Sequence, residues 1–504
     1  MEHPEAYIPM NRRHALARGE DLSERTEGAA LFADISGFTP LTAALLKELG
    51  LKRGSEELAS QLNVVYDALV NEVHRYGGSI LNFSGDAITC WLDNDDGTQA
   101  VACAVALQAV MDQFDSMETP AGSTISLGLK VAVVTGPIRR FQIGDPRIQL
   151  LDTMTGGTLE RMADAEAQAE RGDIIVGPEV VEAIGDLLEI GEYRTDSETG
   201  AQFARITGLT QEIDPTPWPS LPTTLTETQM RPWSLAPVYD RLMGGAGEFL
   251  AEIRPSVALF LRFDGIDYDS DPQAGAKLDA YVRWVQSILL TYESYLLQLT
   301  IGDKGCYLYS SFGSPNLHDD DPARAVAAAL DLQAIPDELS YIGPVQIGIS
   351  QGRMRSGAYG GIKRRTYGSL GDEVNMAARL MGKANPGQIL ASQRVADAVE
   401  DIYELESLGL IKVKGKEEPI PVASILGRRQ QARPRAVNLY PTPLVGRDQE
   451  LSEMEQILAT AEAGQSGHIL RVEGVAGVGK SHLMAEFAQQ TILFGWRVVL
   501  GACH

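Results

Sequence analysis

The sequence has few cysteines, fewer basic than acidic residues, and no long apolar run. Its four cysteines, Cys90, Cys103, Cys306 and Cys503, form no CxxC or CxxH pair, which excludes a zinc pattern and a small disulfide framework. We expect buried, reduced thiols. With 43 Lys and Arg against 68 Asp and Glu, the formal net charge is −25. The chain therefore lacks the broad basic surface that a nucleic-acid polymer requires.

No stretch of about 18 or more apolar residues occurs, and residues 1–20 have no apolar core of the signal-peptide type. The sequence therefore predicts no membrane partner, and we expect a cytoplasmic protein. At 504 residues the chain is too long for one ordinary core. About three domains of roughly 150 residues are expected.

An internal repeat runs through most of the chain. GDIIVGPEVVEAIGDLLEI, from Gly172, recurs as GQILASQRVADAVEDIYEL, from Gly387, an offset of 387 − 172 = 215 residues. Carrying this register backwards gives three further pairs, whose offsets grow from 216 through 222 to 228: Gly136 with Gly352, Asn82 with Lys304, and Asp34 with Arg262. Small loop insertions would produce such a drift. One domain is therefore expected twice.

Two stretches unsuited to regular structure separate the domains. DPTPWPSLPTT (214–224) carries four prolines, which exclude helix and interior strand, and GRRQQARPRA (427–436) follows the second copy. The expected domains are an N-terminal segment (1–25), a first copy (26–212), a Pro-rich linker (213–250), a second copy (251–426), a further linker (427–441) and a C-terminal domain (442–504).

The first copy has a readable order of elements. A strand (29–35) precedes a long amphipathic helix with Leu58, Leu62, Val65, Leu69 and Val73 on one face. A hairpin (79–92) turning at 84–86, a helix (97–114) and a strand (126–136) follow. This order is the ferredoxin-like α+β plan, and we expect it twice.

Two aspartates carry the chemistry of the first copy. Asp34 ends the first strand and Asp86 lies in the hairpin turn, so adjacent central strands would bring both carboxylates to one edge of the sheet. Mg²⁺ is commonly bound by one or two carboxylates together with substrate phosphates. Alternatively, Asp34 caps the following helix and Asp86 only forms the turn.

The surrounding residues favour the metal site. DISGFT (34–39), followed by FSGDA (83–87), resembles the metal-binding motifs of class III nucleotide cyclases. The resemblance implies two Mg²⁺ ions, or Mn²⁺ in their place, held by Asp34, Ile35 and Asp86. It also implies a triphosphate bound at the turn that follows the strand. That turn comprises Ile35, Ser36, Gly37, Phe38 and Thr39.

The second copy lacks both aspartates, because Arg262 takes the place of Asp34 and Leu308 that of Asp86. It carries instead the residues that the resemblance assigns to the substrate. Asn375 and Arg379 lie four apart, on one face of an expected helix, where the first copy has Glu160 and Asp164.

In the family this Asn orients the ribose and this Arg stabilises charge on the phosphates. Lys304, in GDKGC, resembles the Lys that reads adenine, whereas Gly368 stands where relatives use Asp or Thr as the second base-reading side chain. Lys130 resembles a triphosphate-contacting Lys. The alternatives are an exposed hairpin Lys for Lys304 and a solvated helix face for Asn375 and Arg379.

The arrangement of two cyclase copies before a P-loop segment resembles the soluble adenylyl cyclase branch, as does DKGC (303–306). Relatives in that branch bind bicarbonate in the degenerate site with a Lys and an Arg. This chain has Asn82 and Ala163 there, although Arg161 nearby could substitute, so the sequence leaves bicarbonate activation open. The degenerate site leaves room for another small-molecule regulator.

The resemblance implies an adenylate cyclase that converts ATP to 3′,5′-cyclic AMP and pyrophosphate at one site between the paired copies. A guanylate cyclase is one alternative. A non-catalytic, nucleotide-sensing module that regulates a STAND-type ATPase is the other.

The C-terminal domain carries a phosphate-binding motif. GVAGVGKS (474–481) fits G-x-x-x-x-G-K-[ST], with a strand (468–473) and a helix (481–490) expected on either side. The expected nucleotide-binding residues are Gly474, Gly477, Gly479, Lys480 and Ser481. The segment resembles the start of an AAA or STAND ATPase. Only 504 − 474 = 30 residues follow Gly474, so we expect the natural protein to continue, and ATP hydrolysis by this segment is not predicted.

Overall fold

The computed structural model describes residues 3–120, 122–197, 199–245, 252–302, 305–413, 418–429, 444–464, 467–475 and 478–493. The chain divides into two compact units. The first comprises Met1–Ala396 and Ser407–Ile425, and the second comprises Asp397–Glu406 and Leu426–His504. Among the described residues, no helix is long and apolar enough to cross a membrane.

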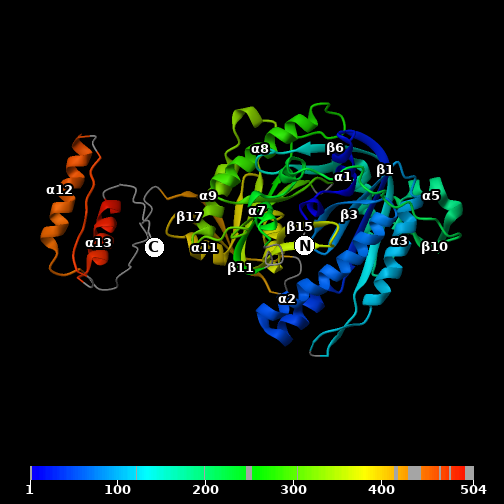
Figure 1. Cartoon of the computed structure of the whole chain (residues 1–504), viewed down its shortest axis with the longest axis horizontal. Helices are drawn as coiled ribbons and strands as arrows, with labels where there is room; N and C mark the ends of the chain where they lie inside the picture. Colours follow the sequence, from blue (N-terminus) through cyan, green and yellow to red (C-terminus); the bar gives the residue numbers. More distant parts are fainter. Residues whose placement is uncertain are drawn as a thin grey trace. The chain divides into compact units, whose positions relative to one another are not determined.

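The first copy of the repeat is built on one mixed sheet in the order β2-β3-β1-β6-β8-β10-β9, with β7 paired to β6. Figure 1 labels β1, β3, β6 and β10 of this sheet. Helices α2 and α3 cover one face, where their apolar side chains pack on β1 and β3, and α4 covers the other. The strands are β1 (Arg25–Ser36), β2 (Ser79–Ser84), β3 (Ala87–Asp93), β6 (Gly128–Ile143), β7 (Leu151–Thr155), β8 (Ile174–Val176), β9 (Leu188–Thr195) and β10 (Gln202–Leu209), with β4 (Met117–Glu118) and β5 (Thr124–Ile125) as a separate pair. The helices are α2 (Phe38–Arg75), α3 (Thr98–Met111), α4 (Gly157–Ala167) and α5 (Pro178–Ile184).

The second copy repeats this order as β12-β13-β11-β14-β16-β18-β17, with β15 paired to β14. Its strands are β11 (Glu252–Phe263), β12 (Tyr295–Thr300), β13 (Cys306–Phe312), β14 (Gln346–Gly360), β15 (Arg365–Leu370), β16 (Ile389–Ser392), β17 (Tyr403–Ile411) and β18 (Ile420–Arg428). Its helices are α8 (Ala274–Thr291), α9 (Asp321–Gln333), α10 (Asp372–Met381) and α11 (Gln393–Val399). The duplication and the α+β class are therefore confirmed, and the four central strands of each copy follow the ferredoxin-like order.

The strand register shows which residues correspond. Asp34 lies opposite Lys130 on β6, and Arg262 lies opposite Gln346 on β14. Both offsets, 262 − 34 = 228 and 346 − 130 = 216, are those found in the sequence. Arg262 therefore occupies the place of Asp34.

Another correspondence is wrong. Leu308 lies opposite Leu261, just as Ile88 lies opposite Ala33, so Leu308 is the counterpart of Ile88 and not of Asp86. The cause is the hairpin turn, which has five residues (301–305) between β12 and β13 but only two (85–86) between β2 and β3.

For the same reason Asn82 does not correspond to Lys304. Asn82 lies opposite Thr89, and the matching pair in the second copy is Gln298 with Tyr309. The counterpart of Asn82 is therefore Gln298.

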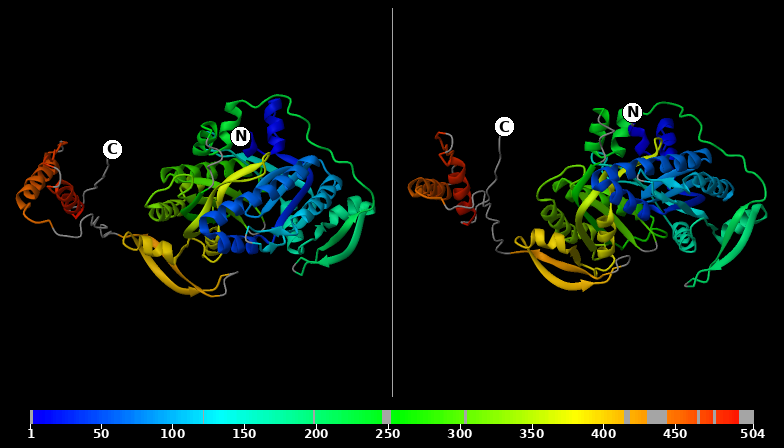
Figure 2. Two further views of the ribbon diagram at one scale, coloured as in Figure 1. Left: turned by 60° about the horizontal axis from the view of Figure 1, so that its bottom comes forward. Right: turned by 90° about the horizontal axis from the view of Figure 1, so that it is seen from below.

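The segment between the copies is partly helical. Residues 214–224 contain neither helix nor strand, as their prolines predict. The following part of the expected linker instead forms α6 (Glu227–Met230), a 3₁₀ turn (Arg231–Trp233) and α7 (Ala236–Met243). A capping box between Thr226 and Gln229 starts α6, a signal that the proline content of this region obscured. This part packs on the N-terminal 3₁₀ turn (Pro4–Tyr7) and α1 (Met10–Arg18), as Figure 2 shows.

The two copies pack against each other within the first unit, side by side in both views of Figure 2. On one side, Arg139 Nη1 of β6 donates to the carbonyl oxygen of Tyr268 at 2.6 Å. On the other, the Ile362 amide donates to Asp67 of α2 at 2.8 Å, and Arg364 Nε donates to the carbonyl oxygen of Ile80 at 2.9 Å.

The second unit contains α12 (Asp448–Gly464) and α13 (Lys480–Leu493), with Met454 and Leu483 buried. The expected helix (481–490) is confirmed. The expected strand (468–473) is wrong, because residues 467–475 adopt no regular structure. A strand gains its hydrogen bonds only from a neighbouring strand, and the described parts of residues 444–493 contain none.

The expectation for the cysteines is confirmed where it is tested. Cys90, Cys103 and Cys306 are buried free thiols, and burial raises the pKa of each thiol. Cys503 lies outside the described residues.

Candidate active site

The turn between β2 and β3 places Asp86 beside the end of β1. Asp34 lies opposite Ala87 in the β1–β3 pairing, and the amide of Ile35 donates to the carbonyl oxygen of Asp86 at 3.2 Å. The helix that follows begins at Phe38, and its N-cap residue is Gly37, which provides no side-chain cap. The alternative role of Asp34 as a helix cap is therefore wrong, and both carboxylates lie at one edge of the sheet.

These two carboxylates are electrostatically coupled. Burial, and then the charge of Asp34, raises the pKa of Asp86 to about 6. Burial also raises the pKa of Asp34, although hydrogen bonding from Lys130 opposes the rise. Two half-buried carboxylates, one of which disfavours the ionisation of the other, fit a site for cations.

Lys130 lies directly across the strand pair from Asp34. Its Nζ lies 3.1 Å from Asp34 Oδ2 and also forms a close ion pair with Glu166 Oε1 on α4. Burial acts to lower the pKa of Lys130, but the hydrogen bonds with Glu166 and Asp34 outweigh it, so the pKa is raised. The amine therefore remains charged at neutral pH.

The turn from Ile35 to the start of α2 has the features of an anion site. Gly37 has a φ of 94°, and a Cβ there would lie 2.4 Å from the Ser126 carbonyl oxygen, so only glycine fits. Ser36 Oγ is buried and has no hydrogen-bond partner among the residues described. The uncapped amides of the first turn of α2 remain available to a phosphate.

The apolar side chain of Ile35 is 2% exposed, so only its main-chain carbonyl could serve a cation. Phe38 begins α2 and packs against the core of the first copy. The side chain of Thr39 lies outside the described part of the structure.

Helix α10 presents Asn375 and Arg379. Its opposite face carries Met376, Ala377 and Leu380, which are buried on the sheet. Asn375 is exposed, and Arg379 is half-buried, with Nη1 shielded from solvent and no hydrogen-bond partner in the part of the chain described. An unpaired, buried guanidinium N–H is costly unless a ligand satisfies it.

The position of α10 is fixed by a close approach to β14. A Cβ at Gly348 would lie 2.2 Å from both the Ala377 carbonyl oxygen and the Met381 amide nitrogen. Ser350 Oγ also donates to Glu373 Oε2 at 2.5 Å. The glycine therefore lets the helix backbone rest on the strand.

A tyrosine of the second copy fills the space beside Gly368. A Cβ at Gly368 would lie 3.2 Å from Tyr359 Cε1 and 3.4 Å from its hydroxyl oxygen. Tyr359 in turn packs against Tyr66 of α2, with ring centroids 6.4 Å apart, and the Tyr66 hydroxyl donates to the Gly85 carbonyl oxygen at 2.6 Å. These contacts connect the wall at Gly368 to the turn that carries Asp86.

The structure thus brings together Asp34, Asp86 and Lys130 in the first copy, and Asn375 with Arg379 in the second. No hydrogen bond or ion pair joins the two sets within the described ranges. Lys304 lies outside those ranges. No group of three or more His, Cys, Asp or Glu able to hold a metal occurs among the described residues.

Comparison with known proteins shows what the second copy is similar to. Residues 293–423 match the family described as "Adenylate and Guanylate cyclase catalytic domain". This part of the chain therefore resembles a nucleotide cyclase domain.

Curated relatives extend the similarity to both copies. Adenylate cyclase type 10 of Mus musculus is 25% identical over 510 residues, which cover 91% of this chain and 30% of the relative. An uncharacterized protein of Mycobacterium tuberculosis is 34% identical over 129 residues, 24% of this chain and 23% of that protein. The chain thus spans about 30% of the length of the type 10 relatives it matches.

A solved structure supports the arrangement of the tandem fold. The "Class III adenylyl cyclase-like ATP-binding protein" from Pseudomonas aeruginosa superposes with a TM-score of 0.52 over 79% of this chain and 93% of that chain. Its sequence identity is 11%, so the likeness concerns the fold alone. The two copies therefore share their fold with a solved structure.

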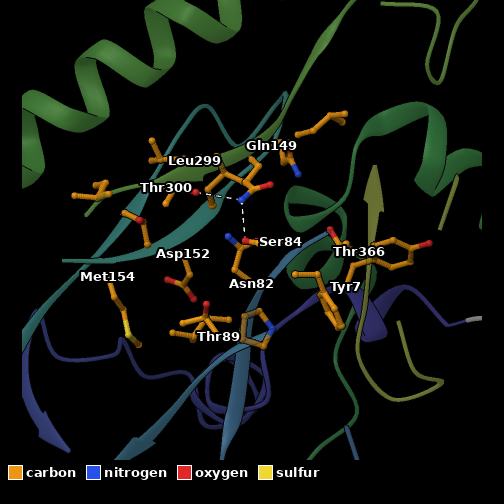
Figure 3. A pocket seen from close by; sticks show the side chains of 18 of the residues that line it. Tyr7, Asn82, Ser84, Thr89, Gln149, Asp152, Met154, Leu299, Thr300 and Thr366 are labelled. Atoms are coloured by element: carbon orange, nitrogen blue, oxygen red, sulfur yellow. Dashed lines mark hydrogen bonds between the residues drawn. The ribbon is translucent and has the colours of Figure 1, made fainter. Parts of the chain in front are cut away.

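The cyclase copies also enclose a cavity of about 410 Å³ (Figure 3). Asn82 and Ala163 of the first copy line it together with Gln298 and Thr300 of the second. Gln298 Nε2 donates to Ser84 Oγ at 3.0 Å and to Thr300 Oγ1 at 3.1 Å. Figure 3 labels these two acceptor residues. The degenerate site expected from the sequence therefore coincides with a cavity.

The charged side chains that line this cavity are Asp152 and Arg364, as far as the structure describes it. Asp152 pairs with Arg12 through two hydrogen bonds of 2.6 and 2.8 Å, and Arg364 donates to main-chain carbonyl oxygens. Arg161 is not among the lining residues and donates to the Thr135 carbonyl oxygen. Arg364, the one cationic side chain of the described lining, is therefore already hydrogen-bonded, and it is not available to bind an anion.

In the second unit, Lys480 Nζ donates to the carbonyl oxygens of Gly474 and Val475, at 2.9 Å each. Gly479 has a φ of 92° and Ser481 lies in α13, whereas Gly477 lies outside the described residues. Nucleotide binding by this segment stays a prediction.

Two residues beside the site were not foreseen. Tyr359 lies beside Gly368, and Glu166 pairs with Lys130. Both contacts join different elements of the fold, so no local sequence motif predicts them. The signal for Tyr359 was the glycine at 368, which leaves space that a neighbour must fill. The signal for Glu166 was an isolated lysine on a central strand, which requires a counter-ion.

Proposed function

We propose that the chain is an adenylate cyclase that converts ATP to 3′,5′-cyclic AMP and pyrophosphate at one site shared by the two copies. The observation that carries this proposal is complementarity. The first copy has the paired carboxylates Asp34 and Asp86, and the second has Arg262 in the place of Asp34 but carries Asn375 and Arg379. Each copy supplies what the other lacks.

Divalent cations fit the first half-site. Two coupled carboxylates and the Ile35 carbonyl offer the hard oxygen ligands that Mg²⁺ or Mn²⁺ prefers. Two such cations, when bound, would lower the pKa of the ribose 3′-hydroxyl and neutralise phosphate charge.

The chain's own side chains supply the remaining parts of the reaction, in which the 3′-oxygen attacks the α-phosphorus and pyrophosphate leaves. The uncapped amides at the start of α2 hold the triphosphate. Arg379 donates its unpaired N–H to the phosphates and stabilises charge that grows during transfer, and Lys130 supports it. Asn375 orients the ribose.

Base recognition belongs to the second copy. Lys304 reads adenine, and Gly368 leaves the second reading position without a side chain of its own. Selection of ATP over GTP therefore rests on Lys304 and on main-chain groups.

The test is cyclic nucleotide formation by the purified chain with ATP or GTP, in Mg²⁺ and then Mn²⁺. We expect cyclic AMP in the wild type and none in Asp34→Ala. Asp112→Ala is the matched control, because it removes an exposed carboxylate of the same copy away from the site. Cyclic AMP from Asp34→Ala at the wild-type rate would refute the assignment.

A second candidate is a module that binds ATP without cyclising it, because a protein of similar fold is described as "ATP-binding". ATP binding with no cyclic product under any of the four conditions would favour this candidate. Cyclic GMP in place of cyclic AMP would instead identify a guanylate cyclase.

A further inference from the structure

The ion pair between Lys130 and Glu166 has no place in the proposed reaction so far. Lys130 Nζ contacts Asp34 on one side and Glu166 on the other, and all three side chains are about three-quarters buried, with 23%, 24% and 28% exposure. The amine is therefore shared between a residue of the proposed cation site and a residue outside it.

Because Lys130 is shared between Asp34 and Glu166, it affects any cation that binds at Asp34. A lysine paired with Asp34 neutralises the carboxylate and competes with the cation for it. If Asp34 were its sole partner, each binding event would have to break that pair and leave a half-buried ammonium without an anion. Glu166 provides a second acceptor that the amine already contacts.

The position of Glu166 at the end of α4 favours its ion pair with the amine of Lys130. It lies in the last turn of α4, where the helix dipole disfavours a carboxylate, and that turn holds no basic residue. Pairing with Lys130 compensates for this placement.

The pair is also absent from the copy that lacks the metal carboxylates. By strand register Lys130 corresponds to Gln346, and by the 215-residue offset of α4 and α10 Glu166 corresponds to Met381. Lysine and glutamate thus occur together where Asp34 is present, and both are missing where Arg262 replaces it.

We propose that Glu166 is a positioning residue, which draws Lys130 away from Asp34 when a divalent cation binds and holds the amine beside the substrate phosphates. The inference rests on the proposed function. Glu166 itself contacts neither the cation nor the nucleotide.

The test measures Mn²⁺ affinity of the full chain without nucleotide, from the electron paramagnetic resonance signal of free Mn²⁺. In Glu166→Gln the amine falls back on Asp34, and we expect binding to weaken on the order of fivefold. In Lys130→Met the competitor is gone, and we expect tighter binding by a similar factor. Glu160→Gln, an exposed carboxylate on the same helix, controls for the change in net charge.

The double variant decides the mechanism. If Glu166 acts through Lys130, then Glu166→Gln in the Lys130→Met background changes Mn²⁺ affinity by less than about twofold. The inference would be overturned if Glu166→Gln weakened Mn²⁺ binding equally in the wild-type and Lys130→Met backgrounds. It would also be overturned if Glu166→Gln weakened Mn²⁺ binding only as much as Glu160→Gln does.

Failure of the proposed function gives a different result. If cyclic AMP formation depends on Asp34, but the effects of Glu166→Gln and Lys130→Met on Mn²⁺ affinity simply add in the double variant, only the role of Glu166 is refuted. Absence of Asp34-dependent Mn²⁺ binding removes both the cation site and the inference.

Discussion

A buried histidine makes the stability of the folded chain sensitive to pH. His74 of α2 is 6% exposed, and neither ring nitrogen has a hydrogen-bond partner among the residues that the structure describes. Burial, followed by the charges of Arg13, Lys363 and Arg364, lowers its pKa from 6.5 to about 3. The folded protein therefore holds this ring neutral.

The sign and size of the effect follow from linkage. Between pH 3 and 6.5 the unfolded chain binds a proton at His74 that the folded chain does not, so stability falls as the pH falls through this window. From pH 7.5 to 5.5 the loss amounts to about 1.4 kcal/mol from this residue alone.

The perturbation is His74→Gln, which is similar in size and does not titrate. Urea unfolding at pH 7.5 and 5.5, followed by tryptophan fluorescence, gives the change in unfolding free energy with pH for each protein. Trp218 reports locally, because its amide donates to the His74 carbonyl oxygen. We expect the pH-dependent loss in the wild type to exceed that in His74→Gln by about 1.4 kcal/mol.

His3→Gln is the matched control, because it removes another histidine ring, whose side chain is 56% exposed. Equal pH dependence in the wild type and in His74→Gln would show that the ring is hydrated or paired in solution, and the reasoning would fail.

Three further predictions concern the second half-site. Arg379→Ala should lower kcat by about 10²–10³-fold with little change in KM, as steady-state kinetics would show, since its interaction grows in the transition state; a change confined to KM would contradict this role. Gly348→Ala should push α10 away from β14 at Ala377 and lower both Tm and kcat, and an unchanged Tm would mean that the helix tolerates the methyl group. Gly368→Thr should not improve ATP selectivity over GTP unless Tyr359→Ala accompanies it, because the tyrosine ring already occupies the space, and improved kcat/KM for ATP in the single variant would refute this.

The sequence predicted the first copy well because its signals are local. Alternating and helical apolar patterns located β1 and α2, and the Gly85–Asp86 turn located the hairpin. The pairing of Asp34 with the neighbouring turn followed from that order. Such features depend on residues that are close along the chain.

The errors arose where partners are distant in the chain or loop lengths differ. Leu308 was matched to Asp86 because the longer turn of the second hairpin cannot be seen without strand register. The strand expected at 468–473 has the right composition but no described neighbour, and its Ile469 is fully exposed. Composition alone does not provide the hydrogen-bond partner that a strand needs.

The contacts of Lys130 and Tyr359 illustrate the same limit. Lys130 was chosen by resemblance, but its partner Glu166 lies 36 residues away on a helix. Tyr359 reaches Tyr66 across nearly 300 residues of chain. Only the folded arrangement reveals these pairs.

Carrying both half-sites on one chain determines how the site assembles. Two separate copies would meet by collision, so diluting them would reduce the paired fraction. Here the segment of residues 210–251 joins them, so the pairing is intramolecular. The two halves are always present in equal number, and the paired fraction does not fall as the protein is diluted.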